Sequence, residues 1–248
     1  MTPWVTRLII ANAVMFVMSM ARPELLNALA FVPVLVLVRP WTLVTYMFLH
    51  AGFSHILFNM IGLFFFGPRL EIELGGRRFL WLYFVSGIMG ALLSFVFNPI
   101  TPIVGASGAI YGIMLGFAFF WPRERLLIWG IFPIEARIMV VLMTALSLFG
   151  GFGGAGDGIA HFAHLGGFAG GYLYLRWTEK TSRATGFRAK LSTPAPRSSD
   201  LQRWTGIRRE DLHEVNRAEL DRIMAKIASS GPSSLTEEER AFLDRFSA

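Results

Sequence analysis

A serine and a histidine lie in two different apolar stretches of this sequence, where a polar side chain is costly to bury. Ser107 belongs to the sequence Gly105-Ala106-Ser107-Gly108, and His164 lies in a later apolar segment. Serine is a weak nucleophile until a base takes its proton, and histidine is the usual base. These residues are therefore candidates for the nucleophile and base of an intramembrane hydrolase. Because Asp157 is about 10 Å from His164 along a helix, the sequence predicts a dyad rather than a triad.

Three further polar residues could complete such a site. His55 and Asn59 are four residues apart, so both side chains leave the same face of a helix. With the backbone N–H of Ser107, they could donate hydrogen bonds to the oxyanion that develops during peptide hydrolysis. Tyr111 lies four residues after Ser107, where its ring would pack beside the base and fix its orientation.

Glycines follow both candidate residues at helical spacing. Small residues let two membrane helices approach closely, and a hydrogen bond between a serine and a histidine on different helices requires that approach. The glycines concerned are Gly108, Gly112 and Gly116 in one segment, and Gly167 and Gly171 in the other.

The composition separates a membrane part from a polar part. The chain has 248 residues, of which 54% are hydrophobic, and its mean hydropathy of +0.51 is too high for one soluble domain. Residues 1–175 contain nine Arg and no Lys, whereas residues 176–248 contain fourteen basic and eleven acidic residues. The net charge of +6 implies no nucleic-acid partner, because arginines at the ends of spans meet anionic lipid headgroups. The absence of cysteine excludes disulfides, iron–sulfur clusters, thiolate zinc sites and a cysteine nucleophile.

Apolar segments of about 20 residues predict the membrane-crossing helices. The first segment is not followed by a small-residue cleavage site, so it is interpreted as a retained span rather than a signal peptide. A shorter run, Leu25–Val38, is broken by Pro33 and is expected to form a loop that dips into the membrane interface. The sequence therefore predicts an all-α polytopic membrane protein with six spans, at Trp4–Ala21, Phe53–Leu70, Phe79–Phe97, Val104–Trp121, Ile134–Phe149 and Gly158–Arg176.

The placement of arginine predicts the orientation of these spans. Residues 98–103 and 150–157 contain no Lys or Arg, and the polar tail after the last span is basic. The positive-inside rule therefore places both termini on the cytoplasmic side. The membrane is expected to be the cell inner membrane or the plasma membrane. The arginines that set the other inner connections are Arg69, Arg77, Arg78, Arg123, Arg125 and Arg137.

This orientation brings the candidate residues to one depth. Ser107, His164, His55 and Asn59 each follow a predicted outer connection closely, so they should lie roughly 5–12 Å below the outer surface. Helix packing alone does not predict a shared depth for polar residues that are far apart in sequence. The shared depth therefore favours a site.

Each of these features also has a simpler explanation. The Gly105–Gly108 run could be a helix-packing surface, the ring of Tyr111 could be ordinary packing, and His55 with Asn59 could be an interhelical hydrogen-bond pair. A transporter or proton channel could use the histidines as a relay, although the span interiors contain almost no acidic partners. A haem protein could use them as axial ligands. The histidines available for both alternatives are His50, His55, His161 and His164.

Four short motifs together resemble the rhomboid family of intramembrane serine proteases. Each motif is weak alone, but the four occur in the family's order and on the corresponding spans across most of residues 1–176. They are His50-Ala51-Gly52-Phe53-Ser54-His55-Ile56-Leu57-Phe58-Asn59, Glu71-x-x-x-Gly75, Gly105-x-Ser107-Gly108 and Ala163-His164-x-x-Gly167-x-x-x-Gly171.

The resemblance implies a catalytic set. Ser107 would be the nucleophile and His164 the general base. The oxyanion would be held by His55, Asn59 and the Ser107 amide. His161 is a second imidazole one turn before His164, but the glycine spacing of the motif follows His164.

The resemblance also implies supporting residues. Tyr111 would stack on the ring of His164, and the glycine-rich loop Gly150–Gly158 would form a mobile cap over the site. The residues expected to line the site are Gly105, Gly108 and Gly167, and those with structural roles are His50, Glu71, Gly75 and Gly171.

The implied activity is hydrolysis of a peptide bond in or near the outer end of a substrate's transmembrane helix. The partners would be single-span transmembrane substrates and the lipid bilayer, with no cofactor, no metal and no nucleic acid. A catalytically silent relative that only binds membrane clients is the alternative within the family.

The polar tail predicts a separate small unit. We expect a protease domain at residues 1–177, a cytoplasmic linker at 178–200, and a helical hairpin at 201–248 that docks or regulates through a cytoplasmic partner. Apolar residues at helical spacing predict a helix over Asp211–Ala228, ended by Ser229–Pro232. Thr236 with Glu239 predicts a capping box for a last helix through Phe246. The alternative is a partly ordered charged tail.

Overall fold

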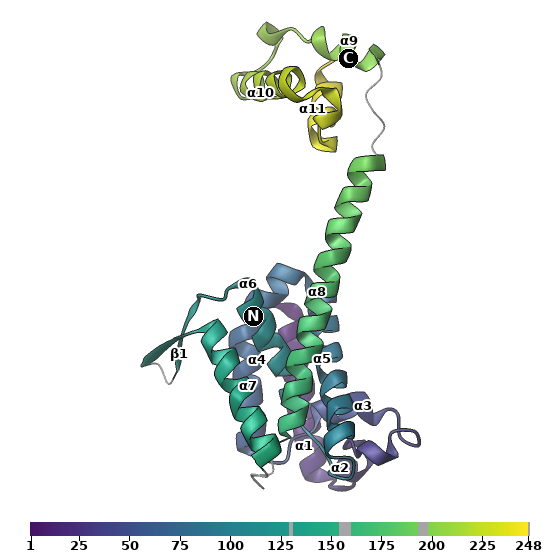
Figure 1. Cartoon of the computed structure of the whole chain (residues 1–248), viewed down its shortest axis with the longest axis vertical. Coiled ribbons are helices and arrows are strands. Elements are labelled where there is room, and N and C mark those ends of the chain that lie inside the picture. The colour runs from purple at the N-terminus through teal and green to yellow at the C-terminus, as the bar shows by residue number, and fades with distance from the viewer. Residues whose placement is uncertain (129–130, 154–159, 193–197, 248) are drawn as a thin grey trace. The chain divides into compact units, whose positions relative to one another are not determined.

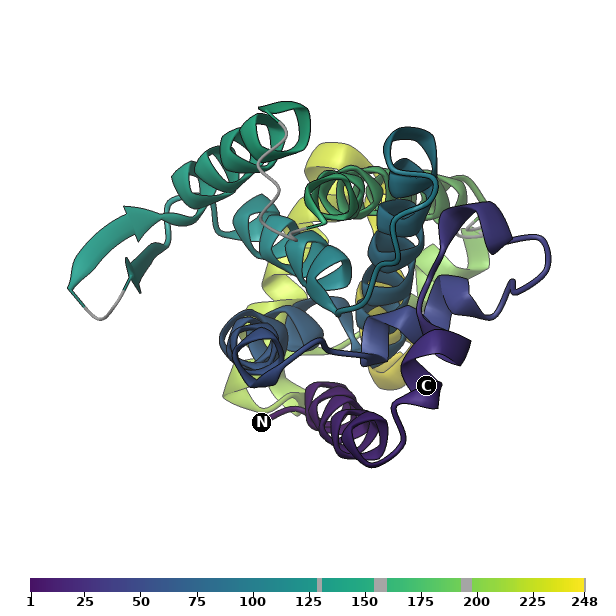
Figure 2. The same ribbon diagram turned by 90° about the horizontal axis from the view of Figure 1, so that it is seen from below.

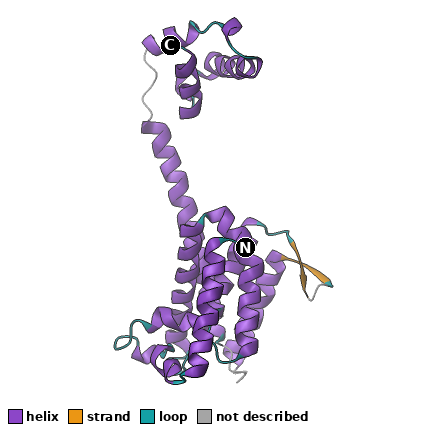
Figure 3. Ribbon diagram, turned by 180° about the vertical axis from the view of Figure 1, so that it is seen from behind, coloured by secondary structure: helices purple, strands orange, loops and turns teal. Residues whose placement is uncertain are grey.

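The computed structural model describes residues 1–128, 131–153, 160–192 and 198–247. In this part of the chain the fold is all-α, apart from a single β-hairpin (Figure 1, Figure 3). The chain divides into two compact units, Met1–Glu179 and Lys180–Ala248, which are described separately below. We call them the membrane unit and the tail unit.

The membrane unit is a bundle of helices that run side by side along one direction (Figure 1). Successive helices alternate in direction, so the connections collect at the two ends of the bundle. The helices are α1 (Pro3–Ala21), α4 (Phe53–Leu74), α5 (Gly76–Phe97), α6 (Ser107–Phe120), α7 (Ala136–Gly153) and α8 (His161–Ser192).

Four of these helices in the described chain are long and apolar enough to cross a membrane: α1, α4, α5 and α7. Helix α6 is apolar but has only 14 residues, fewer than the roughly 20 that a span needs. It packs against α4, α5 and α7, and most of its residues are buried. The preceding chain reaches it in an extended segment that is itself buried at Ile103 and Ala106, so α6 begins inside the bundle. The protein is thus a multi-pass membrane protein, and the count of six spans remains a prediction.

The stretch between α1 and α4 forms several short helical pieces instead of one span. They are α2 (Glu24–Leu29), η1 (Pro33–Leu35), α3 (Thr42–Thr45) and η2 (Tyr46–Phe48). Two hydrogen bonds join Phe31 to Ile103, one in each direction, and the Val34 N–H donates to the Pro99 carbonyl. The apolar run at residues 25–38 therefore covers the chain that leads into α6, and its backbone polar groups find partners there, as buried backbone must.

A β-hairpin connects α6 to α7, and the sequence analysis did not predict it. Strand β1 (Arg125–Ile128) pairs antiparallel with β2 (Phe132–Glu135), with Leu126 opposite Ile134. The fifth helix was predicted from Ile134, but α7 begins at Ala136 because the chain is still extended through Glu135. Residues 134 and 135 are extended because Ile134 pairs with Leu126 and Glu135 pairs with Arg125 in the hairpin.

A buried carboxylate joins the first two long helices. Glu71, near the end of α4, accepts hydrogen bonds from the backbone N–H groups of Trp4 (3.1 Å) and Val5 (2.9 Å). These N–H groups belong to the first turn of α1, so they have no acceptor within their own helix. The helix dipole also favours a negative charge at this end. Gly75 then ends α4 with a φ of +74° and lets α5 begin at once.

The tail unit is a small cluster of helices. Its elements are α9 (Ser198–Thr205), η3 (Arg209–Asp211), α10 (Glu214–Ser230), η4 (Pro232–Ser234) and α11 (Glu237–Phe246). Their apolar side chains form one buried core of Trp204, Leu212, Leu220, Ile223, Leu235 and Leu243. The predicted capping box is confirmed, since the Thr236 hydroxyl accepts from the Glu239 N–H and the Glu239 carboxylate accepts from the Thr236 N–H.

Two expectations for this region differ from the structure in detail. Helix α8 continues to Ser192, so the first part of the segment expected to be a linker is helical. Helix α10 starts at Glu214 rather than at Asp211, because residues 209–211 form a separate 3-10 turn. The prediction of a separate domain at residues 201–248 remains a prediction.

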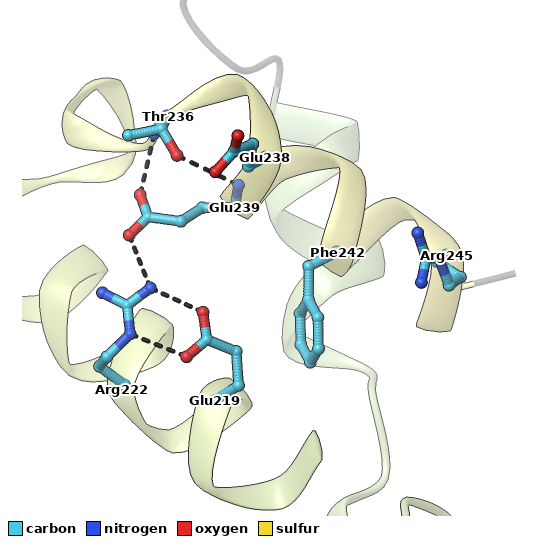
Figure 4. Close-up of a pocket in the computed structure, with 7 residues that line it drawn as sticks. All are labelled: Glu219, Arg222, Thr236, Glu238, Glu239, Phe242 and Arg245. Carbon is cyan, nitrogen blue, oxygen red and sulfur yellow. Dashed lines mark hydrogen bonds and ion pairs between the residues drawn. The ribbon is translucent and has the colours of Figure 1, made fainter. Parts of the chain in front are cut away.

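The polar surface of the tail unit is held by ion pairs. Glu239 contacts Lys226 (2.7 Å). It also contacts Arg222 (2.9 Å), which in turn contacts Glu219 (2.7 Å) (Figure 4). These charges border a shallow pocket of about 410 Å³ between α10 and α11. The residues that line it are Glu219, Arg222, Thr236, Glu238, Glu239, Phe242 and Arg245.

Candidate active site

Ser107 and His164 meet inside the membrane unit. The Ser107 Oγ and the His164 Nε2 are 2.8 Å apart, within hydrogen-bond distance. Ser107 is the first residue of α6, and His164 lies in the first turn of α8, where its side chain is buried. This arrangement allows the imidazole to accept the hydroxyl proton, which is the first requirement of a serine nucleophile.

An aromatic ring fixes the plane of the imidazole. The rings of Tyr111 and His164 are stacked, with centroids 4.1 Å apart and planes 17° apart. The ring of Tyr111 also contacts that of Phe168, with centroids 4.8 Å apart. Tyr111, on α6, therefore packs against two rings of α8.

The close approach of α6 and α8 depends on glycine. A Cβ added at Gly167 would overlap the carbonyl oxygen of Gly108, and a Cβ at Gly171 would lie 2.9 Å from the Cα of Gly112. Any side chain at these positions would push the helices apart. Because a serine hydroxyl reaches only a short distance, the separation of the helices sets the length of the hydrogen bond between Ser107 and His164.

His55 lies beside the approach to Ser107. Gly105 has a φ of +120°, which favours glycine, and a Cβ added there would lie 2.6 Å from His55 Nε2. The Ala51 N–H donates to the His55 Nδ1 at 3.5 Å. With Nδ1 accepting, a neutral imidazole carries its proton on Nε2, the nitrogen that faces Gly105.

Asn59 is one turn further along α4 and is buried. Its Nδ2 donates to the His55 carbonyl at 2.9 Å. An amide nitrogen has two N–H groups, so one donor remains for a further acceptor. The structure therefore places both predicted oxyanion residues on one face of α4, with one of the Asn59 donors already used within the helix.

Two further histidines lie close to the site. The ring of His50, in the connection before α4, is buried and 5.0 Å from the ring of His55. Burial and the nearby imidazole lower the pKa of His50 to about 4, so this side chain is neutral at pH 7. His161 begins α8 against Gly150, with its ring 6.3 Å from that of His164.

The predicted cap is only partly within the described chain. Residues 150–153 form the end of α7, whereas residues 154–159, including Asp157, lie outside the described residues. The expectation of a mobile cap therefore stays a prediction.

One residue that supports the nucleophile segment, Tyr46, was not predicted from the sequence. Tyr46 is buried, its carbonyl accepts from the Gly105 N–H at 3.0 Å, and its hydroxyl donates to the Gly87 carbonyl at 2.8 Å. It thus joins η2, α5 and the chain before Ser107. The only signal in the sequence was a polar aromatic residue at the end of an apolar run, which does not identify its partners.

These elements define a class of protein: a multi-pass membrane protein in which a serine and a histidine from two helices are hydrogen-bonded. The sequence matches a family model described as the Rhomboid domain over residues 38–179. Since the match covers more than half of the chain, the protein belongs to the rhomboid family. A second model, described as a family of unknown function, matches residues 213–248 in the tail unit.

Curated relatives are similar mainly across the membrane unit. RHOMBOID-like protein 1 of Arabidopsis thaliana is 41% identical over 135 residues, which are 54% of this chain and 33% of that protein. Rhomboid protease GluP of Bacillus subtilis is 36% identical over 133 residues, 54% of this chain and 25% of that protein. Rhomboid-like protease 3 of Toxoplasma gondii is 32% identical over 190 residues, 71% of this chain and 68% of that protein. The chain thus spans a third or less of the first two relatives.

Proposed function

We propose that the protein is an intramembrane serine endopeptidase with Ser107 as nucleophile and His164 as general base. The observation that carries the proposal is the 2.8 Å contact between Ser107 Oγ and His164 Nε2. The stacked ring of Tyr111 supports it, because an oriented imidazole is what a base requires.

The reaction would proceed through an acyl-enzyme. Ser107 Oγ attacks the carbonyl carbon of the scissile peptide while His164 Nε2 takes the hydroxyl proton. His164 then gives this proton to the leaving amine as the C–N bond breaks. A water molecule, deprotonated by His164, hydrolyses the ester and restores the serine.

The oxyanion would be held by three donors. These are the His55 Nε2–H, the second N–H of the Asn59 side chain and the backbone N–H of Ser107, which has no helical partner in the first turn of α6. Removing one oxyanion donor costs about 10²–10³-fold in rate in serine hydrolases.

The substrate would be a single transmembrane helix cut in or near its outer end. A helix hides its carbonyls in internal hydrogen bonds and must unwind before attack. Substrates should therefore carry Gly, Ser, Pro or other small residues near the cut, where helix propensity is low. With both termini in the cytoplasm, the site would open to the outer side of the inner or plasma membrane.

The decisive experiment compares Ser107→Ala with the unchanged protein, purified and reconstituted with a model single-span substrate. Hydrolysis should fall by about 10⁴-fold or more, and labelling by a fluorophosphonate should vanish, because no hydroxyl remains to attack. Ser229→Ala, an exposed serine of the tail unit, is the matched control and should keep both signals.

Two results would count against the proposal. Undiminished hydrolysis by Ser107→Ala would remove Ser107 as the nucleophile. A complete lack of labelling and hydrolysis in the folded unchanged protein, combined with retained binding of the substrate helix, would favour the silent client-binding alternative.

A further inference from the structure

The β-hairpin between α6 and α7 carries an apolar surface that nothing in the described chain covers. Its outer half exposes three large side chains: Leu127 (63% exposed), Ile131 (70%) and Phe132 (66%). The inner half differs, because Leu126 and Ile134 pack against the core of the bundle. The hairpin is therefore attached at its base and free at its outer half.

The direction of the hairpin suggests what covers it. Figure 2 shows the helices of the bundle nearly end-on, with the hairpin extending sideways from them. If the helices cross a bilayer, the hairpin runs along the plane of the membrane at one end of the bundle. It joins the end of α6 to the start of α7, so it lies at the boundary where helix ends meet headgroups.

The backbone limits how deep the hairpin can sit. The sheet has two strands in the described chain, so each strand has one edge with unpaired N–H and C=O groups. Such an edge is too costly in the hydrocarbon core. It is tolerated among headgroups and water, where apolar side chains can still enter the upper acyl region.

The charged side chains at the base of the hairpin favour lipids with acidic headgroups. Glu124 pairs with Arg69 (2.9 Å) and Glu135 with Arg137 (2.7 Å). Arg123 and Arg125 are exposed, and in the described chain no ion pair engages them. Two cations next to an exposed apolar surface match an acidic phospholipid headgroup above its acyl chain.

We propose that this hairpin is a docking surface for the acidic phospholipids of the adjoining leaflet. Ile131 and Phe132 enter the upper acyl region, while Arg123 and Arg125 bind the phosphates; the register places Arg125 on the face of the hairpin opposite to Phe132. Because β2 runs directly into α7, the docked hairpin also holds that end of α7 at headgroup depth.

The absence of cysteine makes a direct test possible, because Ile131→Cys gives a single reactive thiol. The full chain would be labelled there with an NBD fluorophore and reconstituted in phosphatidylcholine vesicles with or without phosphatidylglycerol. Quenching by lipids brominated near the headgroup end of the acyl chain would be compared with quenching by aqueous iodide. We expect strong quenching by the brominated lipid and weak quenching by iodide, most clearly with phosphatidylglycerol.

The charge requirement is tested on the same labelled protein. Arg123→Gln with Arg125→Gln should lower the ratio of docked to free hairpin by about 30-fold in acidic vesicles, as expected for two arginines near an acidic surface. Arg203→Gln with Arg208→Gln, both more than half exposed in the tail unit, is the matched control and should change nothing.

The outcomes separate the proposal from its alternatives. A label quenched by iodide equally in vesicles and in detergent, and not by brominated lipid, would overturn it and leave a soluble partner to be sought. Lipid quenching that is the same with and without phosphatidylglycerol, and unchanged in the double arginine variant, would overturn the role of acidic headgroups.

Discussion

In the membrane unit, α6 and α8 meet through glycine backbones, whereas in the tail unit α10 and α11 meet through a small apolar core and ion pairs. The solvent explains the difference. Lipid is as apolar as leucine, so helices in a membrane gain little from burying large side chains and associate through close backbone packing. In water, burial of apolar surface supplies the main driving force, and exposed ion pairs add little.

This comparison also bears on function. The glycine contacts let α6 and α8 approach closely, and that approach sets the distance between Ser107 and His164. All residues of the proposed active site lie in the membrane unit. Changes in the two units should therefore have effects of very different size on hydrolysis.

Among the changes that test this comparison, the largest effect is expected from Gly167→Ala. A Cβ at this position overlaps the Gly108 carbonyl, so α8 must move away from α6 and carry His164 with it. A misplacement of about 1 Å can cost 10²-fold in rate, so hydrolysis should fall by about 100-fold or more, together with the thermal unfolding temperature. Gly52→Ala is the matched control, since nothing lies within 4 Å of its added Cβ. Equal activities of the two variants would contradict the role of the glycine contact.

A smaller effect is expected from loss of the stacked ring. Tyr111→Leu should lower hydrolysis by about tenfold, because an aromatic pair contributes about 0.5–1.5 kcal/mol and here orients the base. Tyr111→Phe keeps the stacked ring and removes only the hydroxyl, so it should retain most activity. If both variants were equally impaired, the hydroxyl rather than the stacking would be the important feature.

The ion pairs of the tail unit should respond to acid. The neighbouring Lys226, with the Thr236 N–H and Arg222, lowers the pKa of Glu239 from 4.5 to about 2. The folded tail favours the charged carboxylate, so this stabilisation is complete above about pH 4.5 and is lost as the pH falls through 2. Both cations are partly exposed, which reduces the effect to about 1 kcal/mol, or about fivefold in local opening.

Hydrogen exchange of the α11 amides measures this opening directly. Protection factors should fall between pH 4.5 and pH 2 in the unchanged chain, and Glu239→Gln should remove most of that dependence. Glu237→Gln, in the same first turn of α11, is the control. A pH profile that is the same in all three proteins would exclude Glu239 as its cause.

The smallest effect is expected from removal of the part of the tail unit that follows Ser192. A chain ending at Ser192 keeps all residues of the proposed active site, so hydrolysis of a model single-span substrate should change by less than about twofold. Loss of activity in a folded truncated protein would mean that the two units are coupled, and would disprove their independence.

Much of the membrane unit could be predicted because its signals are local. Long apolar runs indicated the helices, and the spacing of Gly167 and Gly171 after His164 indicated a close helix contact. The pairing of Ser107 with His164 was also expected, because two polar residues at one depth have few other partners. The capping box of Thr236 and Glu239 lies within four residues and was correct for the same reason.

The features that were missed depend on contacts between distant residues. Tyr46 supports Gly105 only because the chain between α1 and α4 folds against the segment before α6. The hairpin at residues 125–135 was missed because its strands have only four residues each, too few for an apolar pattern to predict their pairing. Helix α9 was missed because Trp204 is its main buried residue, and that residue is fixed by Asp244 forty positions later.

The cap that Glu71 provides for α1 has a consequence for biogenesis. Helix α1 leaves the ribosome before α4, and the carboxylate that satisfies the opening amides of α1 is made 66 residues after Val5. Until the end of α4 has been inserted, those amides must bind water or headgroups. The N-terminal cap of α1 is thus completed only by α4, which links the insertion of the two helices during synthesis.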